Sequence, residues 1–156
     1  MQNLMMTGLA LIAMLSAAPA AAAATDTRAT VDQIVSDAQK VRAEALDIKQ
    51  LLRASQPDLE QVQQRLATLS VHADALKQAM DGFDVAGANL TAAQRAAFDR
   101  ARAATDTLRV LLANKTTMMA DAEAARKNRG LLRAKADGIA KRADIVEQQL
   151  TPLRTT

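Results

Sequence analysis

The apolar residues of this chain recur at alternating steps of three and four over most of its length. The series begins with Val31, Ile34 and Ala38, and it keeps one register as far as Leu150. This register marks 35 positions, called here the seam, and 30 of them carry Ala, Val, Ile, Leu, Met or Phe. Such spacing places side chains on one face of an α-helix. The pattern therefore predicts an all-α fold: an antiparallel helical bundle or coiled coil of three to four long helices with a heptad seam.

Five seam positions are polar or glycine, and such positions often indicate where helices end: Ser55, Gly87, Gln94, Lys115 and Arg129. We predict one helix over residues 28–54 and a second over 57–80, joined by a short turn. The stretch 92–150 contains no Pro, and as a single helix it would be about 88 Å long. It is expected either to break and complete a four-helix bundle or to stay long and pack on a second chain. The candidate breaks are residues 114–117 and 128–130.

The N-terminal segment has the character of an export signal. An apolar run from Leu4 to Leu15 is followed by Pro19 and a run of alanines, and no charged side chain precedes Asp26. This order is typical of a signal peptide. We predict a signal peptide over residues 1–24, a helical bundle domain over 25–156, and a periplasmic or secreted location. The chain has no Cys, so neither a disulfide nor a lipid anchor on cysteine is expected.

Charge is unevenly distributed along the chain. Residues 26–90 hold 7 basic and 10 acidic side chains, whereas residues 91–156 hold 13 basic and 7 acidic ones. The densest basic run is a candidate surface for an anionic partner, such as an acidic protein client or an anionic envelope surface. It comprises Arg126, Lys127, Arg129, Arg133, Lys135, Lys141 and Arg142. A solvated helix face is the alternative interpretation of these seven residues.

Side chains that commonly act in catalysis or bind metal ions are scarce. The chain has no Cys, Tyr or Trp and a single histidine, His72, so we predict no enzymatic activity, no catalytic residue, no metal site and no cofactor. Met80 and Met118 fall on the seam and are expected in the core. Only two Phe are present, which argues against nucleic-acid binding by base stacking.

One short motif, Leu90-Thr91-Ala92-Ala93-Gln94, admits two interpretations. Thr91 and Gln94 have the spacing of a capping box, in which each side chain binds the other residue's backbone amide at a helix start. In an exported, cysteine-free helical chain, Leu-Thr-x-x-Gln also resembles the motif of the Spy/CpxP family of periplasmic chaperones. That resemblance implies a small helical protein that dimerises into a curved cradle and shields unfolded envelope proteins.

These features favour a protein that acts by binding, without a catalytic step. The first hypothesis is a periplasmic chaperone or stress-related protein that binds protein clients. The alternative is a structural coiled-coil module of the cell envelope that forms homo-oligomers through its alanine-rich seam. The sequence leaves both hypotheses open.

Overall fold

The structure is a computed structural model that describes residues 18–155, with side-chain surroundings for residues 26–115 and 118–154. Most of the expected signal peptide lies outside the described residues, and residues 18–24 form the beginning of the first helix. The elements are α1 (Ala18–Leu51), α2 (Leu59–Asp81), α3 (Ala92–Leu112), the short α4 (Lys115–Met118), α5 (Ala122–Leu150) and a 3-10 turn, η1 (Thr151–Thr155).

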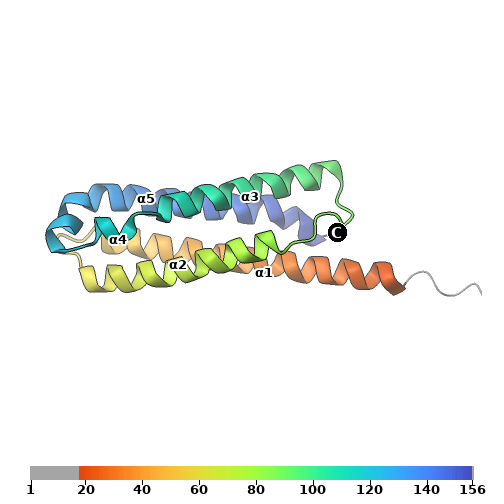
Figure 1. Cartoon of the computed structure of the whole chain (residues 1–156), viewed down its shortest axis with the longest axis horizontal. Coiled ribbons are helices and arrows are strands. Elements are labelled where there is room, and N and C mark those ends of the chain that lie inside the picture. The colour runs from red at the N-terminus through yellow and green to blue at the C-terminus, as the bar shows by residue number, and fades with distance from the viewer. Residues whose placement is uncertain (1–17, 156) are drawn as a thin grey trace, which may run out of the picture.

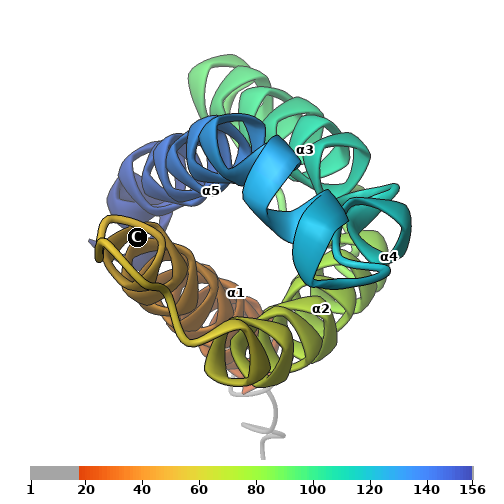
Figure 2. The same ribbon diagram turned by 90° about the vertical axis from the view of Figure 1, so that its left-hand side faces the viewer.

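The four long helices lie side by side as an antiparallel bundle (Figure 1). Viewed along its length, they occupy the corners of a square in the order α1, α2, α3, α5 (Figure 2). The principal packing pairs are α1 with α2, α2 with α3, α3 with α5, and α5 with α1. The prediction of an all-α bundle is therefore confirmed.

The core follows the apolar register closely. Of the 30 apolar seam positions, 26 are buried, three are half-buried, and only Ala122 is exposed. Every seam residue of α1 from Val31 to Ile48 is at most 1% exposed. Met80 and Met118 are buried as expected, and so is Met119. Burial of this apolar surface between four helices is the main source of stability that the fold has available.

The helix boundaries differ from expectation by a few residues, and local hydrogen bonds explain the differences. α1 ends at Leu51 rather than at residue 54, because Arg53 and Ala54 bond to carbonyls three residues back and tighten the chain into a turn. α2 starts at Leu59 rather than at Pro57. Its N-cap is Asp58, whose side chain accepts a 3.0 Å hydrogen bond from the Gln61 amide.

The stretch 92–150 breaks, and it does so at the first of the two candidate positions. α3 ends at Leu112, and Asn114 adopts a φ of 63°, a left-handed conformation that Asn tolerates better than most residues. The chain then makes the single turn of α4 before Asp121 caps α5, accepting a 2.7 Å bond from the Ala124 amide. The break returns the chain along the bundle, so α5 packs on both α1 and α3.

The second candidate break, residues 128–130, is wrong. α5 runs through these residues without interruption. A glycine in a helix costs only about 1 kcal/mol, and α5 buries Ala125 and Leu132 on either side of Gly130. Packing of those turns outweighs the local preference.

Candidate interaction surface

The Leu-Thr-x-x-Gln residues form the N-terminus of α3. The Gln94 amide donates to Thr91 Oγ1 at 3.2 Å, and the Thr91 amide donates to Gln94 Oε1 at 2.9 Å. The predicted capping box is therefore confirmed. Leu90 is half-buried and packs against the core. All three residues thus have a structural role at this helix start.

The loop before this cap is held by the only two aromatic residues of the chain. Phe83 and Phe98 stack with ring centroids 4.6 Å apart, and the Arg102 guanidinium lies 5.1 Å from the Phe98 centroid. Within the loop, Asp84 Oδ1 accepts bonds from the Ala86 and Gly87 amides at 3.1 and 2.9 Å. These contacts hold the loop between α2 and α3 against the start of α3, where the cap lies.

The seven residues of the basic run do not form one continuous patch. Arg129 donates from Nε to the Leu52 carbonyl at 2.7 Å and from Nη2 to the Ala54 carbonyl. Lys135 Nζ lies 3.5 Å from the Ala113 carbonyl, and Lys141 pairs with Asp137 at 2.8 Å. Three of the seven side chains are therefore engaged within the fold.

The other four make no ion pair among the described residues, but they differ in exposure. Arg126, Lys127 and Arg142 are exposed, whereas Arg133 is half-buried. The Nε atom of Arg133 is buried and has no hydrogen-bond partner among the described residues. Arg142 lies 15 residues beyond Lys127, about 22 Å along the helix, so Arg126 and Lys127 are the exposed cations that lie together.

Arg126 also lines an open hollow between the α1–α2 turn and the first turns of α5. Both segments lie at the same end of the bundle (Figure 1). This turn hollow has a volume of about 680 Å³ and is lined by Ser55, Gln56, Pro57, Leu59, Arg126 and Arg129. None of the lining residues is acidic. An arginine in such a place is suited to bind a carboxylate through two parallel hydrogen bonds.

Three of the four carboxylates of α5 lie toward α1, away from Arg126. The fourth, Glu123, is exposed in the first turn of α5 and forms no ion pair among the described residues. Asp137 pairs with Lys49, and Asp144 lies 3.6 Å from Arg42. Hydrogen bonds from Lys141 and Lys49 lower the pKa of Asp137 from 3.8 to about 2. The acidic side chains in the C-terminal half of α5 thus join this helix to α1. The N-terminal half, in which Glu123 is the one acidic residue, keeps an excess of positive charge.

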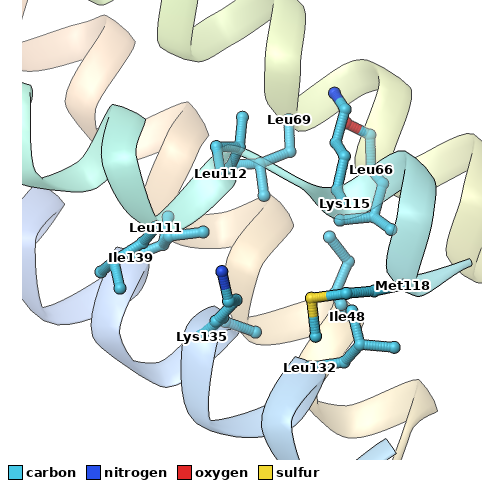
Figure 3. Close-up of a pocket in the computed structure, with 11 residues that line it drawn as sticks. Ile48, Leu66, Leu69, Leu111, Leu112, Lys115, Met118, Leu132, Lys135 and Ile139 are labelled. Atoms are coloured by element: carbon cyan, nitrogen blue, oxygen red, sulfur yellow. The ribbon is translucent and has the colours of Figure 1, made fainter. Parts of the chain in front are cut away.

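A small cavity lies at the helix break, and no sequence pattern predicted it. The cavity has a volume of about 20 Å³ and lies between all four long helices and α4. Its wall is mostly apolar, with the side chains of Lys115 and Lys135 at its edge (Figure 3). The sequence signal for it was Lys115, a cation at a seam position within a candidate break.

His72 is half-buried on α2. In the described part of the chain, no three His, Cys, Asp or Glu side chains are grouped so that they could hold a metal ion. None of the helices within residues 18–155 combines the length and apolar character that crossing a membrane requires.

Comparisons of the chain with protein-family models, with curated proteins and with solved structures gave no match.

Proposed function

We propose that this chain is an exported, non-enzymatic binding protein that holds acidic or partly unfolded protein clients, in the manner of a periplasmic chaperone. The observation that carries the proposal is the turn hollow, which two arginines and no carboxylate line. An acidic side chain of a client would find an unpaired guanidinium at Arg126 and a second positive group at Arg129.

The protein would recognise its clients mainly by charge rather than through an apolar surface. Among the residues whose exposure is described, the large exposed apolar side chains are Leu46, Val71, Val110 and Leu131, and each belongs to a different long helix. Apolar residues scattered singly in this way are normal for a soluble surface. Encounter with a client would therefore depend on long-range attraction, which salt screens beyond about 8 to 10 Å.

The test follows the aggregation of a heat-stressed acidic model protein in the presence of this chain, at low and at high salt. The test variant changes Arg126 and Lys127 to Gln, which removes two positive charges and keeps helix propensity. The matched control changes Arg28 and Arg95 to Gln. These two arginines are also exposed, and they lie at the opposite end of the bundle.

We expect suppression of aggregation to weaken with salt and with the Arg126/Lys127 change, and to survive the Arg28/Arg95 change. Equal loss in both variants would show that net charge matters and the turn hollow does not. No suppression by the folded protein at any ratio would contradict the chaperone proposal. Binding of the protein to anionic vesicles, lost in the same variant, would instead indicate an anionic envelope surface as the partner.

Export is part of this proposal. Mass spectrometry of the mature protein should give an N-terminus between Ala21 and Thr25. The first buried residue that the structure describes is Val31, so cleavage there would shorten α1 and leave the described core whole. Recovery of intact Met1 in a membrane fraction would contradict export.

The alternative proposal is a structural module of the cell envelope that forms homo-oligomers. Burial of the seam within one chain weighs against self-association through it, because those side chains are no longer available to a partner. Self-association through the outer faces of the helices remains compatible with the fold, and sedimentation would detect it.

A further inference from the structure

The break between α3 and α4 leaves a gap in the side-chain packing. At Asn114 the chain leaves the register of α3, and Lys115 takes the next seam position, where an apolar side chain would otherwise fill the core. The small cavity described above lies at this point. Its apolar wall includes Ile48, Leu66, Met118 and Leu132, one from each of α1, α2, α4 and α5 (Figure 3).

An open groove adjoins the cavity on the surface between α2 and α4. The groove has a volume of about 370 Å³ and is lined by Gln63, Leu66, Ala67, Lys115, Met119 and Ala120. Leu66 and Lys115 line both spaces. The groove and the cavity therefore meet at these two side chains, and the volume of the groove is within the range of small-molecule sites, about 300 to 1,000 Å³.

Two lysines beside the groove and the cavity form only long hydrogen bonds to backbone carbonyls. Lys115 Nζ lies 3.4 Å from the Leu66 carbonyl, and Lys135 Nζ lies 3.5 Å from the Ala113 carbonyl. Both distances are longer than ordinary hydrogen bonds, and neither lysine forms an ion pair among the described residues. Burial lowers the pKa of Lys115 from its usual 10.5, although the charge of Asp74 acts in the opposite direction. A half-buried cation of this kind gains from an anionic partner.

We propose that the groove and cavity at the α3–α4 break bind a small amphiphile with an anionic head, an alkyl carboxylate, whose head group pairs with Lys115. The alkyl chain would lie along Leu66, Ala67 and Met119 and reach toward Met118. This arrangement combines burial of apolar surface with a charge-assisted hydrogen bond, as small-molecule sites commonly do. The site is separate from the turn hollow and does not depend on the function proposed for it.

The first experiment is calorimetric titration of the purified protein with dodecanoate, below the concentration at which this probe forms micelles. We expect saturable binding at one site. The same titration with dodecyltrimethylammonium carries the same alkyl chain on a cationic head, and we expect its affinity to be at least tenfold lower. Equal affinity for the two probes would overturn the proposal, because the lysine would then contribute nothing.

Three variants test the location of the site. Lys115→Gln removes the charge and leaves a shorter, neutral polar side chain. We expect at least a tenfold loss of affinity, the scale of one charge-assisted hydrogen bond. Ala67 is exposed, so Ala67→Phe should fill the groove without disturbing the core and should abolish binding. Arg95→Gln, which removes one exposed charge far from the groove, should leave the affinity unchanged.

Methionine methyl resonances give a readout that does not depend on the variants' stability. On addition of dodecanoate, the signals of Met118 and Met119 should shift. Met80 is fully buried in the last turn of α2, far along the bundle from the break, and its signal should stay in place. Shifts of all three signals together, or unchanged affinity in both Ala67→Phe and Lys115→Gln, would show that the amphiphile adsorbs elsewhere and would overturn the proposal.

Discussion

Arg129 shows how a single residue can be misjudged from sequence alone. As a cation on the apolar seam, it suggests the end of a helix. In the structure its guanidinium reaches across to the carbonyls of Leu52 and Ala54, where α1 has just ended. The last carbonyls of a helix lack partners within that helix and carry partial negative charge. Arg129 therefore stabilises the C-terminus of a neighbouring helix while α5 continues past it.

The two glycines within α5 provide a matched test at the same scale. A Cβ on Gly130 would meet no atom within 4 Å, whereas a Cβ on Gly138 would lie 3.0 Å from Leu111 Cδ1. We expect Gly130→Ala to raise the free energy of unfolding by about 0.5 to 1 kcal/mol. Gly138→Ala should give no gain, because Leu111 must move. Urea denaturation measures both, and an equal gain in the two variants would contradict the close approach of α3 to α5 at Gly138.

Asp137 gives a pH dependence that can be assigned to one side chain. Its pKa is lowered to about 2 by Lys141 and Lys49, so the carboxylate is favoured in the folded protein relative to the unfolded chain. Its contribution to stability should be complete above about pH 4 and disappear as the pH falls toward 2. Denaturation of the wild type and of Asp137→Asn across this range should give curves that converge at low pH. Parallel curves would show that the two lysines do not act on this group.

At the scale of the elements, each long helix after the first has a defined start. Asp58, Thr91 and Asp121 cap α2, α3 and α5, and each accepts a bond from the backbone amide three residues further on. Such caps satisfy amides that a helix leaves unpaired in its first turn. The Leu-Thr-x-x-Gln motif forms one of these three starts. Of the three, it alone has both hydrogen bonds of a capping box.

Substitutions of Thr91 separate the two interpretations of this motif. If the motif acts as a cap, Thr91→Ala should lower the free energy of unfolding by about 0.5 to 2 kcal/mol, and Thr91→Ser should be nearly neutral. Urea denaturation at neutral pH is the measurement, with suppression of aggregation as a parallel assay. Loss of suppression in either variant at wild-type stability would show that the motif has a role beyond capping.

At the scale of the whole molecule, the decisive feature is a core completed by one chain. The break at Asn114 lets α5 fold back along the bundle, and the seam positions of all four long helices are then buried against one another. An unbroken helix from residue 92 to residue 150 would have needed a partner chain for part of its apolar face. The longest described helix, α1, has 34 residues, or about 51 Å.

Two solution measurements follow from a core of this kind. The urea midpoint should not depend on protein concentration over a hundredfold range, because folding does not require association. Small-angle scattering should give a particle close to the length of α1 and well short of the roughly 88 Å of an unbroken C-terminal helix. A midpoint that rises with concentration would mean that a second chain completes the core.

The sequence by itself determined the helical class, most of the core and one of the three caps. Local rules govern these features: apolar residues at steps of three and four place one face of a helix inside, and Thr91 with Gln94 caps a helix through bonds three residues apart. Only the tertiary structure decided between residues 114–117 and 128–130 as the break. It also decided which basic side chains stay free, because Asp137 and Asp144 lie against α1 while Arg126 faces the turn hollow. Those outcomes depend on which helices become neighbours, and contacts between residues some 80 to 100 positions apart are not encoded in any local pattern.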